Sequence, residues 1–255
     1  MKCNINRKRN EKLQGDPRLR EIYENLDKLT IGPDEAFKFH FTMCGKCCVH
    51  REDIILTPKD LFRMAKKLGI TPDEVVRDYC DTYVGDTSRF PIVKLKSVGA
   101  DRHCPLLKDN KCSVHEEKPV VCAMFPIGRT ISVEGDDLPN TRITPDKIRY
   151  IFVNPGCGDD SETHTVREWF GEFGLSMEDE YFIRWQRALN SISMSLRGLE
   201  KKLDVELMHP VWNAVYLAIY LNYDMNGGFM EQFDANAERI VSLMKSLEDE
   251  VGEKA

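Results

Sequence analysis

Residues 43–48 read Met-Cys-Gly-Lys-Cys-Cys, and we take this stretch as the point around which the chain is organised. It places three thiols within five residues, although Leu or Val would fill a core equally well without the hazard of oxidation. Further cysteines follow at Cys104, Cys112, Cys122 and Cys157. Together the two groups predict that thiols from distant parts of the chain meet at one metal or iron–sulfur centre.

The composition is that of an ordinary globular protein. Hydrophobic residues make up 42% of the 255-residue chain, which is enough to build a core without disulfide bonds. The net charge of −6 argues against non-specific binding to nucleic acid. The longest apolar run, residues 211–221, is too short to span a bilayer, and no apolar segment follows the basic residues 7–9 as in a secretory signal. We therefore expect a cytoplasmic protein with no membrane partner, in which cysteines serve as ligands or redox groups before they form disulfides.

Apolar periodicity and turn residues outline the secondary structure. Helices are expected at residues 18–29, 57–69 and 71–80, and the last two begin with Thr-Pro, a helix-start signal. Short strands are expected at residues 37–41, 90–98, 125–133 and 148–153. A small hairpin or loop is expected between Cys104 and Cys112.

From residue 165 onward the apolar spacing is helical. The predicted fold class is therefore α+β, a compact cysteine-rich metal-binding domain with an all-helical C-terminal extension. The expected divisions are an N-terminal helical segment at 1–36, a cysteine-cluster metal-binding domain at 37–160 and a helical extension at 161–255.

The first cysteine group contains a two-ligand knuckle, Cys44-x-x-Cys47, of the kind that zinc sites and iron–sulfur clusters both use. Cys48 extends it to a doublet. Adjacent side chains usually point apart, so the doublet fits two nearby centres, one cluster plus a functional thiol, or a Cys48 that packs in the core. The glycines on either side of Cys157 would let backbone N–H groups approach its sulfur closely.

The second cysteine group has spacers of seven and nine residues and no second C-x-x-C pair, unlike an ordinary zinc ribbon. The dense cysteine runs of bacterial ferredoxins and of radical S-adenosylmethionine enzymes are absent as well. No G-x-G-x-x-G or P-loop is present, so a Rossmann-type methyltransferase or an NTPase has no support.

Other motifs accompany the thiols in a fixed order: Phe39 before the knuckle, Cys104-Pro105-Leu106, Lys118-Pro119-x2-Cys122-x2-Phe125-Pro126 and Pro155-Gly156-Cys157-Gly158. Over residues 37–158 this order resembles the YkgJ-type cysteine-cluster family, the CxxCxxCC zinc- or iron-chelating domain, which has flagellin lysine N-methylase as a relative. The sequence departs from the family pattern at Phe41, where the first cysteine is expected, at Ala123, where an Arg is usual, and at His115, where a Tyr-like residue is expected.

The resemblance implies that a zinc ion or an iron–sulfur cluster is held by the seven family cysteines that remain: Cys44, Cys47, Cys48, Cys104, Cys112, Cys122 and Cys157. His50, His103 and His115 lie close in sequence and could replace the missing thiol, although each is more readily explained as a loop residue or a hydrogen-bond donor to sulfur. Cys3 and Cys80 are expected to stay outside the centre.

Three functions are left open by the residues. The first is an iron–sulfur protein, with [4Fe–4S] preferred, in redox or cluster-assisted chemistry. The second is a structural zinc module whose helical part is an interaction surface. The third is a protein-lysine N-methylase that uses the cluster and S-adenosylmethionine. A protein substrate or a redox partner is implied by the first and third of these, and whether the protein is an enzyme stays open.

Overall fold

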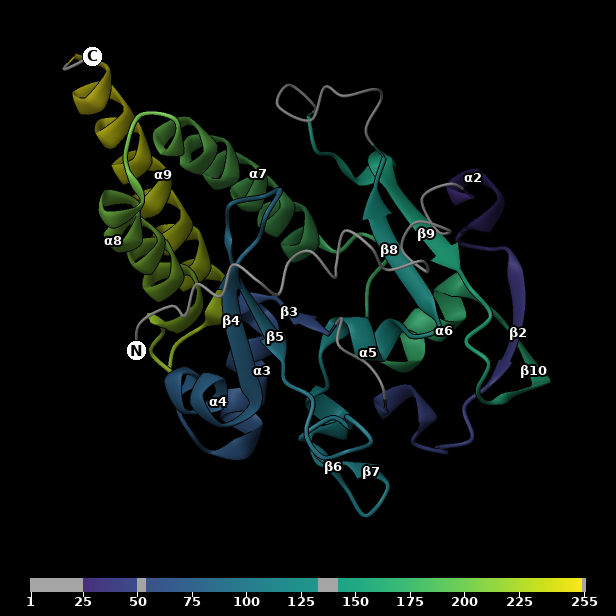
Figure 1. Ribbon diagram of the computed structural model, residues 1–255. Helices are drawn as coiled ribbons and strands as arrows, with labels where there is room; N and C mark the ends of the chain where they lie inside the picture. The colour runs from purple at the N-terminus through teal and green to yellow at the C-terminus, as the bar shows by residue number, and fades with distance from the viewer. Residues whose placement is uncertain (1–24, 50–53, 133–141, 254–255) are drawn as a thin grey trace.

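The computed structural model describes residues 25–49, 54–132 and 142–253. Helices and small antiparallel sheets alternate along the chain up to residue 165, and only helices follow. Figure 1 shows α7, α8 and α9 gathered at one end of the molecule, while β2, β8, β9 and β10 lie at the other. The α+β class and the helical C-terminal region are therefore confirmed. None of the helices within the described residues is long and apolar enough to cross a lipid bilayer.

The helices are α2 (Leu26–Leu29), α3 (Pro58–Leu68), α4 (Pro72–Tyr79), α5 (Val120–Met124), α6 (Val166–Glu172), α7 (Glu180–Glu200), α8 (Val205–Tyr216) and α9 (Phe229–Glu253). Short 3₁₀ helices lie at η2 (Lys46–Cys48), η3 (His115–Glu117) and η4 (Pro145–Lys147), and a π-helical turn, η5 (Leu217–Leu221), continues α8. The strands are β1 (Thr30–Ile31), β2 (Ala36–His40), β3 (Ile55–Leu56), β4 (Cys80–Val84), β5 (Pro91–Leu95), β6 (Leu107–Lys108), β7 (Lys111–Cys112), β8 (Ile127–Ile131), β9 (Ile148–Phe152) and β10 (Asp159–Thr165).

The two Thr-Pro helix starts are confirmed. In α3 the Thr57 hydroxyl accepts the Asp60 N–H while the Asp60 carboxylate accepts the Thr57 N–H, which forms a full capping box. Thr71 and Glu74 do the same at α4. The helix expected at 18–29 lies mostly outside the described residues, and its described end, α2, stops at the predicted residue 29.

All sheets are antiparallel and have the strand orders β1-β9-β8, β3-β5-β4, β10-β2 and β6-β7. The expected strands and the hairpin that ends at Cys112 are confirmed. Four of the described strands were not expected, and two of them, β1 and β3, are only two residues long. β4 starts at Cys80, where a helix end was predicted, and β10 has the wholly polar sequence Asp-Asp-Ser-Glu-Thr-His-Thr, so neither carried an alternating apolar signal.

Two hydrophobic cores hold the molecule together. The larger joins α3, α4 and the β3-β5-β4 sheet to α7, α8 and α9, with Leu56, Phe90 and Trp212 among its most buried members. The smaller joins β2, β8 and β9 to α6 and the start of α7 around Phe37 and Trp169. Each core contains residues from both sides of position 160. The domain limits given by the sequence stay a prediction.

Asp60 links α3 to α5, and its replacement should be costly. Besides capping α3, its Oδ1 accepts the Val120 N–H at 2.8 Å, and the carboxylate is buried. Asp60→Ala would leave buried donors without an acceptor, so we expect a loss of about 3 kcal/mol in the free energy of unfolding. Glu74→Ala removes the equivalent group from the exposed box of α4 and should cost about 1 kcal/mol or less. Urea titration compares the two, and equal losses would contradict this role for Asp60.

Candidate metal centre

The stretch at 43–48 leaves the end of β2 and turns sharply at Gly45. Gly45 has φ of +73°, a conformation that glycine adopts without strain, and it begins the 3₁₀ turn η2. Within this turn the Sγ atoms of Cys47 and Cys48 lie 3.9 Å apart. The expectation that adjacent side chains point apart is therefore wrong here, because the tight turn brings the two sulfurs together. Tetrahedral thiolates around one zinc ion would be about 3.8 Å apart, given Zn–S bonds of about 2.3 Å.

Hydrogen-bond donors surround the sulfur of Cys44. The Lys46 N–H, the Thr42 hydroxyl and the Gly158 N–H donate to it, and these contacts hold the pKa of the exposed Cys44 thiol below its usual value, the Lys46 N–H having the largest effect. Gly158 can approach because it has no side chain: a Cβ there would lie 2.4 Å from the carbonyl oxygen of His40. Backbone N–H donors of this kind stabilise thiolates, including those bound to metals.

A second turn of the same kind begins at Cys104. Its sulfur accepts the backbone N–H groups of Leu106 and Leu107, which lower the pKa of the thiol while burial raises it more. The Cys104 N–H in turn donates to the carbonyl of Cys48 at 2.8 Å, which joins the two cysteine groups directly. Cys112 lies opposite Leu107 in the β6-β7 hairpin. The described residues therefore include a second turn with N–H groups that donate to sulfur, although the sequence shows only one C-x-x-C.

Electrostatic contacts connect thiols from both groups. The pKa of Cys48 is raised, first by its hydrogen bond with Cys47, then by burial, and then by the neighbouring thiols of Cys47, Cys104 and Cys122. Cys104 interacts in the same way with Cys112 and Cys47. Cys44 also interacts with Cys47, so six of the seven predicted cysteines are connected by such contacts. Among them one thiolate disfavours the next, and a bound cation would remove the conflict.

The remaining cysteines occupy two other places. Cys157 is half-buried. The N–H of its neighbour Gly158 donates a hydrogen bond to the sulfur of Cys44, so this flanking glycine stabilises Cys44. Cys80 is buried in the larger core, where burial raises the pKa of its thiol. Cys3 lies outside the described residues.

The thiols do not form a complete set of metal ligands in this arrangement. Among the described residues, no three His, Cys, Asp or Glu side chains are placed so that they could hold one ion. The donor set fits a soft or borderline metal because it consists of thiols, two of which are already spaced like neighbours on one ion. Ligation by three or more of them requires side-chain movement.

Of the three candidate histidines the structure describes two, His103 and His115, and neither belongs to a group of described side chains that could hold a metal ion. His50 lies outside the described residues. The ring of His103 pairs with Asp101 at 2.7 Å, and burial lowers the pKa of His115. Phe41, which stands where the family pattern has a cysteine, presents its ring to the ammonium of Lys118 at 5.5 Å.

Lys118 stands in the Lys118-Pro119-x2-Cys122 motif, but the sequence assigned it no role of its own. Only 8% of it is exposed, and its Nζ lies 4.1 Å from the centre of the Phe173 ring. Burial lowers the pKa of Lys118, while the thiols of Cys122, Cys112, Cys47 and Cys48 act in the opposite direction. A lysine in a Lys-Pro pair is ordinarily an exposed turn residue, so the sequence did not predict the burial of Lys118.

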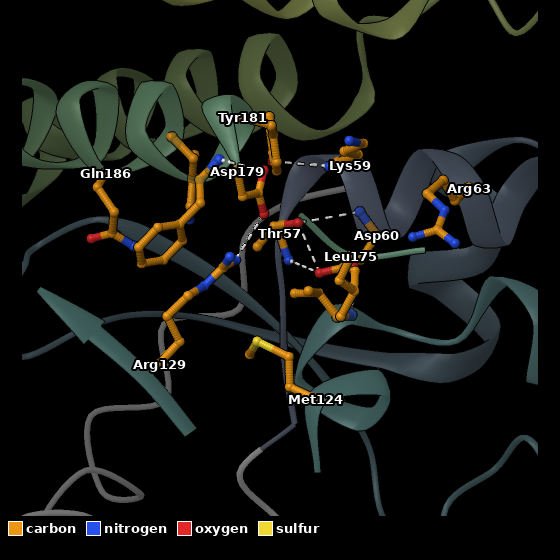
Figure 2. Close-up of a pocket in the computed structure, with 13 residues that line it drawn as sticks. Thr57, Lys59, Asp60, Arg63, Met124, Arg129, Leu175, Asp179, Tyr181 and Gln186 are labelled. Atoms are coloured by element: carbon orange, nitrogen blue, oxygen red, sulfur yellow. Dashed lines mark hydrogen bonds and ion pairs between the residues drawn. The ribbon is translucent and has the colours of Figure 1, made fainter. Parts of the chain in front are cut away.

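A cavity of about 110 Å³ is lined by residues of α3, α5, β8 and the start of α7 (Figure 2). Arg129 spans one wall, where it pairs with Asp179 at 3.0 Å and stacks over Phe182 at 3.8 Å. Its Nε is buried and has no hydrogen-bond partner among the described residues, so an ordered water would fit there. Of the described residues, no cysteine lines this cavity, and it is distinct from the thiol cluster.

These features define a cysteine-rich α+β protein with thiols gathered from two segments. Comparison with known families agrees: residues 41–143 match the CxxCxxCC family, described as "Putative zinc- or iron-chelating domain". The resemblance seen in the sequence is confirmed over that segment. An uncharacterized protein of Methanocaldococcus jannaschii is 30% identical over 88 residues, which cover 34% of this chain and 44% of that relative. The match thus spans less than half of the relative's length, and no solved structure matches.

The two kinds of thiol environment should differ in chemical reactivity. In the metal-free protein we expect iodoacetamide to modify Cys44 at least about tenfold faster than Cys80, because the pKa of Cys44 is lowered in an exposed position and that of Cys80 is raised by burial. Peptide mass spectrometry over a time course measures both rates. Similar rates for the two residues would contradict the hydrogen bonding described for Cys44.

Proposed function

We propose that the protein binds zinc or iron through thiolates of both cysteine groups. The observation that carries this proposal is the gathering of Cys47, Cys48, Cys104, Cys112 and Cys122. A reduced thiol cluster without metal is an oxidation hazard, and its members oppose one another's ionisation. A cation that binds several thiolates would stabilise the same arrangement. The description of the matching family names zinc and iron, the two metals proposed here.

The doublet supports a single ion as the first candidate. The separation of 3.9 Å between Cys47 and Cys48 suits two ligands of one tetrahedral zinc or iron ion. Bound there, the ion would contribute folding free energy by joining η2, the β6-β7 hairpin and α5. Cys47 and Cys48 would form one edge of the site, Cys104 and Cys122 would supply further thiolates, and the N–H donors at Cys44 and Cys104 would stabilise thiolate charge.

An iron–sulfur cluster, with [4Fe–4S] preferred, is the second candidate. Seven thiols exceed the four that a mononuclear site uses, and a cluster or a second ion would engage more of them. In a [4Fe–4S] cluster each iron takes one cysteine, so adjacent Cys47 and Cys48 would not both be ligands of one iron. A redox role and a lysine N-methylase activity with S-adenosylmethionine stay predictions that follow from this second candidate alone.

Anaerobic purification followed by elemental analysis and sulfide determination separates these candidates. The first predicts about one zinc or iron per chain without inorganic sulfide. The second predicts a brown protein with about four irons and four sulfides per chain. A colourless protein that contains no metal and binds neither zinc nor ferrous iron on titration would refute the proposed function.

A further inference from the structure

The cavity that Arg129 borders is larger than a single ordered water requires (Figure 2). Its volume is about 110 Å³, whereas one water needs roughly 10–15 Å³ measured in the same way. Apolar side chains form part of its lining, among them Met124, Leu175, Phe182 and Trp185. An ordered water needs about two to four polar partners, so waters alone would match this apolar wall poorly. The space suits a small organic molecule of about four to six non-hydrogen atoms.

The cavity also has a hydrogen-bond donor that the protein leaves unused. The side chain of Arg129 is only 3% exposed, and its Nε has no hydrogen-bond partner among the described residues. Its Nη2 pairs with Asp179 at 3.0 Å, as Figure 2 shows, so the guanidinium is held in place while the Nε–H stays free. A buried N–H without an acceptor is unfavourable, and an acceptor oxygen on a bound molecule would satisfy it.

The two carboxylates in the lining are already engaged. Asp60 accepts the Val120 N–H at 2.8 Å, and it also accepts the N–H and the hydroxyl of Thr57, at 2.9 and 2.8 Å. Asp179 caps α7 with one oxygen and pairs with Nη2 of Arg129 through the other. Neither carboxylate reaches the Nε–H, so the acceptor that fits there is one carried by a ligand.

Lys59 adds a positive charge to the same lining. Its Nζ lies 5.1 Å from the centre of the Tyr181 ring, and it makes no ion pair with a carboxylate of the described residues. The ring attracts the ammonium but does not neutralise it. The other two cations of the lining, Arg63 and Arg129, each pair with a carboxylate. An anionic oxygen would therefore meet both an unused donor and an unpaired charge.

We propose that this cavity binds a small organic carboxylate. One carboxylate oxygen accepts the Nε–H of Arg129, Lys59 supplies the attraction for negative charge, and the hydrocarbon part lies against Met124, Leu175 and Trp185. A neutral molecule of the same shape would leave the charge of Lys59 unpaired. An inorganic anion would leave the apolar lining unmatched. The site is separate from the metal centre, because no described cysteine lines the cavity.

The test uses butyrate, butyramide and inorganic phosphate as probes, at constant ionic strength. Butyrate and butyramide have the same number of non-hydrogen atoms and differ in charge, whereas phosphate is an anion without a hydrocarbon part. Each is titrated into ¹⁵N-labelled full-length protein, and NMR spectra follow the Nε–H signal of Arg129 and the indole N–H of Trp185. The Arg129 signal is assigned by its loss in the Arg129→Lys variant.

Three variants of the full chain accompany the wild type. Arg129→Lys keeps a cation opposite Asp179 but has no Nε–H, and Lys59→Gln removes the unpaired charge. Lys66→Gln removes an exposed lysine of the same helix, α3, and serves as the matched control. Because Lys59→Gln leaves the ion pair of Arg129 intact, it tests the proposal even if Arg129→Lys destabilises the fold.

We expect butyrate to bind the wild type saturably, with a dissociation constant below about 5 mM and a shift of the Arg129 Nε–H signal. Butyramide and phosphate should bind at least about tenfold more weakly, and both Arg129→Lys and Lys59→Gln should weaken butyrate binding by about tenfold. Lys66→Gln should stay within about twofold of the wild type.

No saturable shift with butyrate up to about 50 mM would show that the cavity holds only water, and it would overturn the proposal. Equal affinities for butyrate and butyramide, or for butyrate and phosphate, would overturn it as well. The same conclusion would follow from butyrate binding that Lys59→Gln leaves unchanged. None of these outcomes bears on the binding of zinc or iron by the thiols.

Discussion

Replacing Cys47 and Cys104 together with serine is expected to reduce the metal content to about a tenth of that of the wild type or less. Cys47 belongs to the doublet and Cys104 to the second group, and the two thiols interact with each other across the cluster. Because one ion shared by both segments would lose a ligand from each, the remaining thiols could not hold it. Elemental analysis of protein prepared under identical conditions gives the result directly.

Cys80→Ala is the matched control for this experiment. Cys80 is more buried than the half-buried Cys47 and Cys104, and it lies in the hydrophobic core at the start of β4. The variant should retain the full metal content and lose only packing. If Cys80→Ala lost the metal while the double variant kept it, the assignment of the centre would be contradicted.

The Cys48→Ser variant tests whether Cys48 binds the same metal ion as Cys47. With its sulfur 3.9 Å from that of Cys47, Cys48 should behave as a ligand of the same ion, and its loss should lower affinity as strongly as the loss of Cys47 alone. A Cys48→Ser variant with unchanged affinity would favour an accessory thiol, one of the alternatives that the sequence left open.

Phe90→Ala should cause the largest loss of stability, about 3–5 kcal/mol in the free energy of unfolding. Phe90 is 1% exposed, and its ring meets Trp185 of α7 edge-on at 5.6 Å and Tyr220 of η5 at 6.4 Å. Its removal would open a cavity between the β3-β5-β4 sheet and the C-terminal helices. Urea unfolding followed by circular dichroism and by tryptophan fluorescence gives the value.

The control for Phe90→Ala is Leu243→Ala, which truncates an exposed leucine of α9 and should cost about 0.5 kcal/mol or less. Because the larger core contains residues from both parts of the chain, the two probes should report one transition for Phe90→Ala. Separate transitions for the helices and the sheets would instead support independent domains.

Local sequence signals predicted much of the fold. The Thr-Pro helix starts at Thr57 and Thr71 are chemically specific, since the hydroxyl, the fixed proline φ and the acidic residue three positions later all favour one geometry. Apolar alternation likewise marked β2 through Phe37 and Phe39. Tertiary pairing, in contrast, creates β10: its polar residues form a strand because β2 offers an edge to pair with.

The candidate site shows the same division. Cysteine identity and spacing marked the seven candidate ligands, because few other functions explain so many thiols in a reduced chain, and their binding of one metal stays a prediction. The short distance between the sulfurs of Cys47 and Cys48 results from the backbone turn at Gly45, which cysteine spacing does not predict. The turn at Cys104, whose N–H groups donate to the Cys104 sulfur, likewise has no signal in the spacing. Lys118 became recognisable only when its burial and its neighbours were known.

X-ray absorption spectroscopy at the metal edge tests most directly whether both cysteine groups share one centre. For the wild-type protein the account predicts about four sulfur neighbours at roughly 2.3 Å from the metal. The Cys47→Ser/Cys104→Ser variant, if it is reloaded with metal, should lose sulfur neighbours from that shell. A wild-type shell dominated by nitrogen or oxygen, with fewer than three sulfur neighbours, would contradict a shared thiolate centre.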